Sequence, residues 1–205
     1  MNMKSIVALS LFFAMLLFGC SRENNKWTSS PVYESLHNAG CSDYNIAALQ
    51  KLNITEEETA QVVTMRNAGV AAPTVVRLFD LDRRYNRQFA IGDDIARLRN
   101  AGISDISLID LVSLRAVADW TRDIVAMRNA GIDEQTVEEL AAMKFKDGKP
   151  IIDGEELASI KNTGYSAEGI VILCRHGITE DQVQKVIKLR NEGKSENEIV
   201  AQLFP

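Results

Sequence analysis

The sequence is poor in the side chains that most often carry catalysis. It contains only two histidines, His37 and His176, and neither adjoins a serine, cysteine or carboxylate in a nucleophile arrangement. The motifs HExxH and GxSxG and a glycine-rich phosphate loop are all absent. We therefore expect no enzyme, no catalytic residue and no small-molecule substrate.

Metal ligands and cofactor motifs are equally scarce. The stretch KDGKPIIDGEE (146–156) superficially suggests a calcium loop, but its acidic residues do not occupy the alternate positions before glycine that an EF-hand needs. We expect no metal and no cofactor.

Three cysteines are too few for a disulfide framework. Cys41 and Cys174 occupy apolar positions of the pattern described below, so we interpret them as small core residues. They belong to the first and third repeat units, and an extended array would hold them beyond the roughly 7 Å that a disulfide can bridge. We expect both thiols to be free.

Positive charge is also in deficit, because 23 Lys and Arg stand against 28 Asp and Glu, for a net charge of −5. Nucleic-acid-binding domains usually carry a basic surface, so the charge argues against a nucleic-acid partner.

Residues 1–19 have the character of a targeting segment. Lys4 is followed by an uncharged apolar run from Ile6 to Phe18, shorter than the ~20 residues that a comfortable membrane span requires. The run ends at Gly19-Cys20 and not at a small-x-small cleavage site. Removal of this segment removes Lys4 and no acidic residue.

Leu17-Phe18-Gly19-Cys20 resembles the lipobox of bacterial lipoproteins. The resemblance covers residues 1–20 only, and Phe18 departs from the small residue usual before the glycine. It implies cleavage before Cys20, acylation of Cys20, and, with Ser21 following, an outer-membrane position facing the periplasm. Two or three acyl chains would anchor the protein firmly. The alternative is a plain signal peptide with an unmodified Cys20. Residues 20–30 would form a lipidated tether.

One phrase recurs six times between residues 31 and 205. Its glycines are separated by 29, 33, 29, 33 and 29 residues, so the sequence predicts a unit of 62 residues in two unequal halves, present in about three copies. The copies are LHNAGC (36–41), MRNAGV (65–70), LRNAGI (98–103), MRNAGI (127–132), IKNTGY (160–165) and LRNEGK (189–194).

The phrase is typical of a helix that ends in a Schellman turn. Such a turn needs glycine in the left-handed conformation. It also needs an apolar contact between the residue after the glycine and the residue four positions before the glycine. The basic residue before each asparagine complements the helix dipole. The asparagine is the same in every copy; either a bond to the next turn or a repeated contact with a ligand would explain it.

Each phrase is followed by a helix start. Ser42, Ser104, Asp133, Ser166 and Ser195 are N-cap residue types, with Ala71 the exception. Relative to each glycine, the positions at minus seven, minus four and plus six are always apolar, and plus nine is leucine in five copies. Spacings of three and four place them on one helical face.

We therefore predict an all-α fold of short helical hairpins in a tandem array over residues 31–205. The array is either solenoid-like or closed into a compact bundle. The signature residues of the known repeat families of similar period are absent.

Two equivalent segments, 83–94 and 144–156, are predicted to be loops. Each begins basic and ends acidic, and in a solenoid they would emerge on the same side. The acidic residues at the end of each segment suit the N-terminus of a helix, whereas no such local interaction explains the basic residues at the start. They are candidate partner-binding residues, the alternative being solvated charges: Arg83, Arg84, Tyr85, Arg87, Lys144, Lys146 and Lys149.

The sequence thus favours a membrane-anchored lipoprotein whose helical array binds a protein partner in the bacterial envelope. The alternative is a structural component that binds peptidoglycan or lipid headgroups through the basic segments.

Overall fold

The computed structural model describes residues 30–84, 92–117 and 119–205. The predicted signal peptide, Cys20, most of the tether, and Tyr85 and Arg87 lie outside these residues. Within them the chain forms twelve α-helices, one π-helix and no strand, so the all-α prediction is confirmed. The helices are α3 (Pro31–Asn38), α4 (Asp43–Lys51), α5 (Glu56–Asn67), α6 (Ala72–Arg84), α7 (Gly92–Asn100), α8 (Asp105–Ser113), α9 (Thr121–Asn129), α10 (Glu134–Ala141), the π-helix η1 (Ala142–Lys146), α11 (Gly154–Asn162), α12 (Ala167–Arg175), α13 (Glu180–Asn191) and α14 (Glu196–Leu203).

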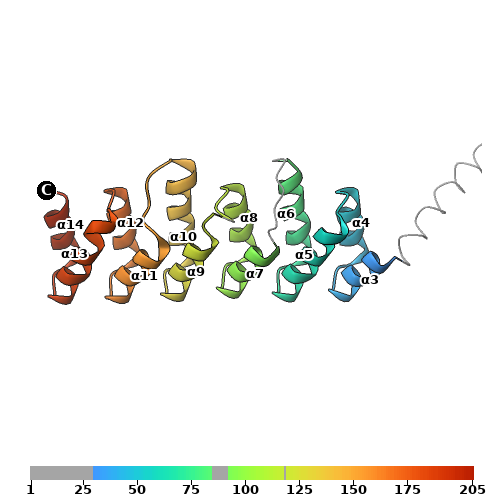
Figure 1. The fold of residues 1–205 in the computed structure, drawn as a ribbon, viewed down its shortest axis with the longest axis horizontal. Coiled ribbons are helices and arrows are strands. Elements are labelled where there is room, and N and C mark those ends of the chain that lie inside the picture. Colours follow the sequence, from blue (N-terminus) through green and yellow to red (C-terminus); the bar gives the residue numbers. More distant parts are fainter. Residues whose placement is uncertain (1–29, 85–91, 118) are drawn as a thin grey trace, which may run out of the picture.

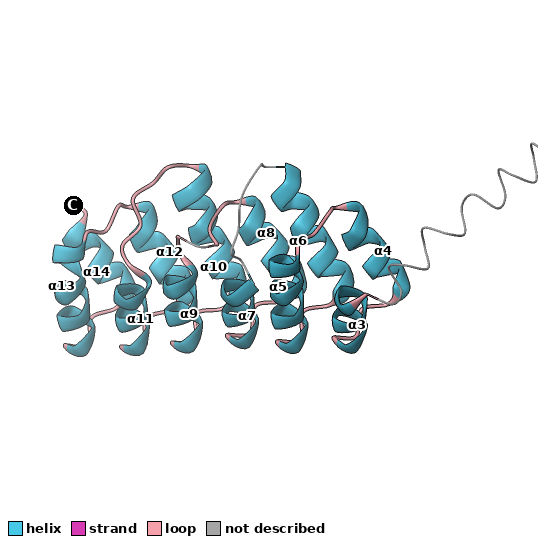
Figure 2. Cartoon of the chain, turned by 45° about the vertical axis from the view of Figure 1, so that its right-hand side comes forward, coloured by secondary structure: helices cyan, strands magenta, loops and turns pink. Residues whose placement is uncertain are grey.

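The helices form hairpins that lie side by side in one extended array (Figure 1). The odd-numbered helices α3 to α13 make one row, each packed on the next, and the even-numbered helices α4 to α12 make a second row in the same way. Figure 2 shows the two rows from the side. Each hairpin contacts its neighbours, as expected for a solenoid.

The recurrent phrase forms the turn between the two helices of every hairpin. All six glycines have positive φ, between 79° and 87°. In five copies the amide after the glycine donates to the carbonyl of the residue four positions before it, as Cys41 N does to Leu36 O at 3.1 Å. These are the bonds of a Schellman turn, so the prediction is confirmed. We call the row of six turns the corner edge; it is the lower edge in Figure 1.

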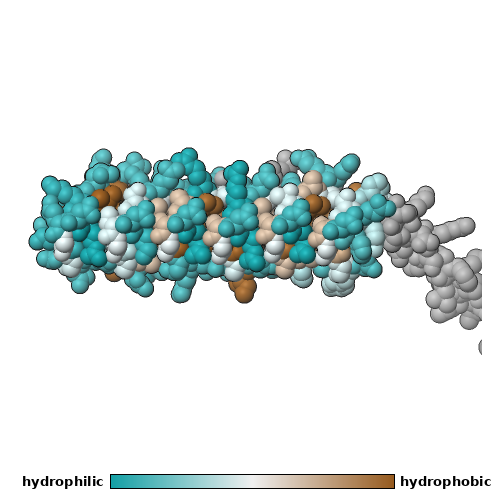
Figure 3. All heavy atoms as spheres, turned by 90° about the horizontal axis from the view of Figure 1, so that it is seen from below, coloured by the Kyte–Doolittle hydropathy of each residue, from teal (hydrophilic) through white to brown (hydrophobic). Residues whose placement is uncertain are grey.

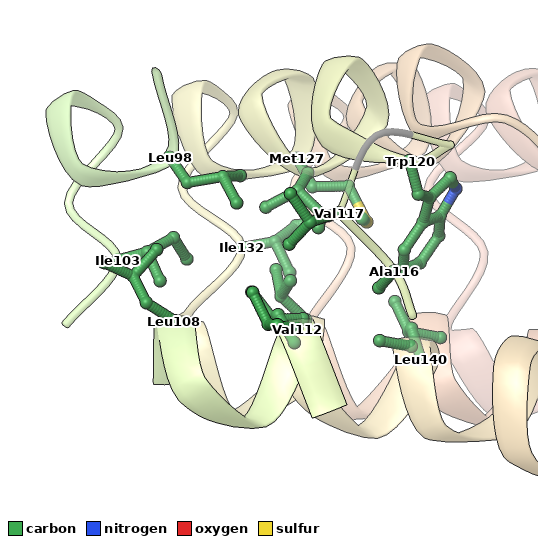
Figure 4. Close-up of a cluster of buried hydrophobic side chains, with 14 of the residues drawn as sticks. Leu98, Ile103, Leu108, Val112, Ala116, Val117, Trp120, Met127, Ile132 and Leu140 are labelled. Atoms are coloured by element: carbon green, nitrogen blue, oxygen red, sulfur yellow. The ribbon is translucent and has the colours of Figure 1, made fainter. Parts of the chain in front are cut away.

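The core fills the space between the two rows. The leucines at plus nine (Leu49, Leu78, Leu111, Leu140 and Leu173) are fully buried, and so are nearly all residues at plus six. Figure 4 shows part of this layer, with Leu98 and Met127 of the first row on one side and Leu108 and Leu140 of the second row on the other. Because every hairpin contributes the same positions, the core continues along the array.

The predicted N-caps are present in the structure. Ser30, Ser42, Ser104, Asp133 and Ser166 each accept a hydrogen bond from the backbone amide three residues on. Capping boxes occur at α5, α13 and α14.

The two segments predicted as loops are partly helical. Arg83 and Arg84 form the last turn of α6, and Lys144 to Lys146 belong to η1. At their other ends, Gly92 and Gly154 begin α7 and α11. The apolar positions of α6 and α10 extend the core beyond the point where the charge pattern suggested a loop, because Leu81 and Met143 are buried there.

Gly154 lies against the backbone of the neighbouring first-row helix. A Cβ atom at this position would lie 2.3 Å from the carbonyl oxygen of Asp123, and the Gly154 amide donates to Asp123 Oδ1 at 2.7 Å. Gly92, 62 residues earlier, meets Gln61 in the same way, at 2.8 Å from its Cβ. Glycine thus allows α9 and α11 to approach closely.

We predict that Gly154→Ala destabilises the array by about 1–3 kcal/mol, because the added methyl group must displace the backbone of α9. Ser159→Ala, at an exposed site of the same helix, is the control. Urea unfolding followed by circular dichroism measures both. Equal midpoints for the glycine variant and the wild type would show that α9 and α11 are not in close contact.

Candidate functional site

Arginines of the recurrent phrase bind the corner of the preceding hairpin. The last carbonyls of a helix have no partner inside the helix, and the neighbour's guanidinium supplies donors to them. Arg66 Nε donates to Ala39 O (3.1 Å) and Nη2 to Gly40 O (3.3 Å), Arg128 binds Ala101 O and Gly102 O in the same way (3.3 Å each), and Arg190 Nη2 binds Gly164 O (3.0 Å).

The same arginines also bind their own corner. Arg128 Nη1 donates to Ile132 O at 2.9 Å, and Arg66 Nη1 donates to Val70 O. Each of these side chains therefore joins two successive turns. The sequence predicted only the favourable interaction with the helix dipole.

Acidic side chains form a second set of bonds, at the N-termini of the second-row helices. Asp105 Oδ2 accepts from Ala71 N (2.9 Å) and Thr74 Oγ1 (2.7 Å). Ala71 occupies the N-cap position of the one corner whose own N-cap residue has no polar side chain. Asp105 of the next hairpin supplies the acceptor there. Glu196 similarly accepts from the amide and hydroxyl of Ser166, at 2.6 and 2.7 Å.

Glu134 has the corresponding position at α10. It accepts from Ser104 N at 3.0 Å and from the Ser104 hydroxyl. Burial alone would raise the pKa of this carboxyl, but the hydrogen bonds from Ser104 and Ser107 outweigh burial and hold its pKa below the ordinary value. The carboxylate is therefore ionised at neutral pH, as its accepting role requires.

Of the candidate partner-binding residues, Arg83 is already engaged. Its Nη2 lies 2.7 Å from both carboxylate oxygens of Glu58, and its Nε donates to Leu52 O at 3.1 Å. Arg84 pairs with Asp80 at 2.9 Å. These contacts give both arginines a role inside the array.

The lysines of the second basic segment, 144–156, differ in their surroundings. Lys144 Nζ lies 5.0 Å from the ring centroid of the buried Trp120, and Phe145 packs edge-on against the same indole at 5.8 Å. Lys146 and Lys149 are exposed. The segments end at one side of the array, as predicted, because α6 and α10 both reach the edge opposite the corner edge (Figure 1). Four of the seven candidates are exposed, namely Arg83, Arg84, Lys146 and Lys149, but Arg83 and Arg84 are held in ion pairs within the array. Lys144 is half-buried against Trp120, and Tyr85 and Arg87 lie outside the described residues.

The asparagine of the phrase is exposed in all six copies: Asn38, Asn67, Asn100, Asn129, Asn162 and Asn191. None of their carboxamides is hydrogen-bonded to another described residue. The alternative of a bond to the next turn is therefore not realised in the structure.

Two of the most exposed large apolar side chains lie in the first turns beyond the corners. Tyr44 of α4 is 83 % exposed and Ile106 of α8 is 74 % exposed, and they occupy the same position in their hairpins. Seen from below, the corner edge repeats one pattern of polar and less polar residues along its length, with an apolar protrusion near the middle (Figure 3).

A cleft of about 380 Å³ lies between α10 and α12. It is lined by Glu139 and Arg175, which form an ion pair across it, and by the half-exposed Ile172. Its remaining walls are largely polar, so the cleft could accommodate a polar side chain of a partner.

Both cysteines of the array are buried and free. Burial raises the pKa of the Cys174 thiol to about 12. Burial also raises the pKa of Cys41, although Arg66 acts in the opposite direction. Neither thiol is therefore a nucleophile at neutral pH.

No known protein family and no curated protein matches this chain. Within the described ranges, no helix is long and apolar enough to cross a membrane. In the same part of the chain, no three His, Cys, Asp or Glu residues are grouped as a metal site would require.

We predict that Arg128→Met destabilises the array by about 1–3 kcal/mol, because three carbonyl oxygens lose a charged donor while the apolar part of the side chain is retained. Arg97→Met is the matched control, because Arg97 is largely exposed and its one ion pair is long, with 4.0 Å between Arg97 Nη1 and Asp94 Oδ1. Denaturant unfolding compares the two. Equal effects would mean that the bonds between corners contribute nothing to stability.

We also predict that Asp105→Ala costs about 1 kcal/mol, because α6 loses its cap. Adding Ala71→Ser should restore part of this loss, since the serine hydroxyl would accept from the amide of Thr74, three residues on, and so cap α6 from within its own hairpin. The single and double variants are compared by thermal melting. No recovery in the double variant would contradict the capping role of Asp105.

Proposed function

We propose that this protein is a lipid-anchored, periplasm-facing lipoprotein of the bacterial envelope whose helical array binds a protein partner. The observation that carries the binding role is the extended array itself. Its twelve helices pair into six hairpins, and no other described helix covers either long edge of the two rows (Figure 1). Arrays of this kind offer long binding surfaces because each repeat packs only on its neighbours.

The anchoring part of the proposal rests on the lipobox resemblance at residues 17–20. The array begins at Ser30, so about ten residues would separate the acylated Cys20 from the first hairpin. Ten extended residues span at most about 35 Å, which keeps the array next to the membrane surface.

The alternative, a structural component that binds peptidoglycan or lipid headgroups, now rests on Lys146 and Lys149. Both are exposed beside the segment that connects η1 with α11. Arg83 and Arg84 support it less, because Glu58 and Asp80 already neutralise them.

In-cell crosslinking followed by affinity capture tests the proposal, with Cys20→Ser as the test variant and Ser21→Ala as its matched control. We expect incorporation of labelled fatty acid and a discrete crosslinked protein for the wild type and Ser21→Ala. Cys20→Ser should lose the fatty acid and the membrane-associated fraction of that product.

Fatty-acid labelling of Cys20→Ser equal to that of the wild type would contradict the anchor. Recovery of peptidoglycan or lipid without any protein, abolished by Lys146→Glu with Lys149→Glu, would support the structural alternative in place of a protein partner.

A further inference from the structure

The asparagines of the corner edge are the residues of the recurrent phrase that the fold does not explain. Each of the apolar, basic and glycine positions of the phrase has a structural role. The apolar residue fills the core, the basic residue binds carbonyls of the corners, and the glycine adopts positive φ. At Gly40 and Gly102 the glycine also leaves room for the arginine, because a Cβ would lie 3.0–3.2 Å from Arg66 or Arg128.

The asparagine is also an unfavourable choice for its own helix. Alanine at the same helical position would stabilise the last turn, since asparagine has a lower helix propensity. Nevertheless the asparagine and the glycine are the two positions at which all six copies of the phrase are the same. An exposed amide with no partner in the described array is available to bind something else.

We propose that the asparagine row is a binding surface for an extended protein segment in the polyproline II conformation. This inference rests on the proposed protein-binding function and names the surface and the conformation of the partner. A carboxamide offers two donors and an acceptor, which complement the carbonyl and amide groups of a peptide backbone.

The spacing of the row selects this conformation. The asparagines end successive first-row helices, which pack directly on one another. Packed helices lie about 8–10 Å apart. A polyproline II helix repeats every three residues over about 9.3 Å and leaves its backbone polar groups free. A β-strand presents equivalent groups every ~6.7 Å, which does not match.

Two exposed apolar residues in the helices that follow the corners fit the same partner. Tyr44 and Ile106 protrude from the first turns after two of the corners. Aromatic and apolar side chains pack well on proline rings, and proline-rich segments are commonly bound in this way. The asparagines thus bind the backbone, and Tyr44 and Ile106 contact the side chains of the partner.

Fluorescence anisotropy with the purified full-length protein in detergent micelles tests this proposal. The probe is a labelled peptide of repeated Ala-Pro-Pro triplets, one triplet per hairpin, in which alanine keeps one amide per turn. A Gly-Ser peptide of equal length and oligomers of N-acetylglucosamine are the comparison probes. We expect the wild type to bind the Ala-Pro-Pro peptide most tightly.

The test variant is Asn100→Ala with Asn129→Ala, which removes two neighbouring carboxamides. Its matched control is Gln50→Ala with Gln184→Ala, which removes two exposed amides away from the corner edge. We expect the asparagine variant to bind about tenfold more weakly, for the loss of two hydrogen bonds. Its melting temperature should be unchanged or higher, and the control should bind like the wild type.

A lower melting temperature for the asparagine variant would overturn the proposal, because the asparagines would then be structural. Equal peptide binding by both variants, or preference of the wild type for the glycan oligomers, would also overturn it. Capture of a crosslinked protein partner is a separate readout. The protein-binding function therefore stands if the array still captures its partner with both asparagines replaced.

Discussion

The hydrogen bonds that one hairpin makes to the open helix ends of the preceding hairpin are the interactions on which the rest of this structure depends. Every corner has carbonyls at the end of one helix and amides at the start of another that cannot be satisfied inside those helices. A short hairpin alone leaves these groups to water. Here Arg66, Arg128 and Arg190 bind the carbonyls, and Asp105, Glu134 and Glu196 bind the amides. Because the partners lie on neighbouring hairpins, the bonds fix the stacking of the array as well as its turns.

At the edge opposite the corner edge, one contact between the two helices of a hairpin is an ion pair in one hairpin and an aromatic pair in another. In the second hairpin, Glu58 and Arg83 join the start of α5 to the end of α6 by a bidentate ion pair. At positions 62 residues further along the chain, Trp120 and Phe145 make the corresponding contact as an aromatic pair. Both pairs tie the two helices of a long hairpin together. The contact is therefore retained although its side-chain chemistry differs and the chain is α-helical at Arg83 but π-helical at Phe145. At the corners the phrase itself is retained, with the glycine in all six copies and an arginine in four of them.

Much of the fold could be predicted from the sequence because the determining interactions are local. Glycine, the capping residues and the apolar positions act within a few residues of one another, and they specify the helices and turns. The contacts between hairpins could not be predicted in this way. Nothing near Ala71 indicates that Asp105 caps it, and nothing near Arg83 indicates that Glu58 neutralises it, because these partners are 34 and 25 residues apart in the chain. The sequence therefore did not predict that Arg83 and Arg84 are already held in ion pairs within the array. It also left open whether the asparagines of the phrase bind the next turn, and only the structure shows that all six are exposed.

Amide hydrogen exchange measured by NMR tests the central claim most directly. The amides of Ala71, Ser104 and Ser166 lie in turns, and each donates to a carboxylate of the next hairpin. Protection at these three amides comparable with that of the adjoining helices would show that neighbouring hairpins satisfy each other's helix ends. Exchange as fast as in an unstructured chain would show that the hairpins are held together by the apolar core alone.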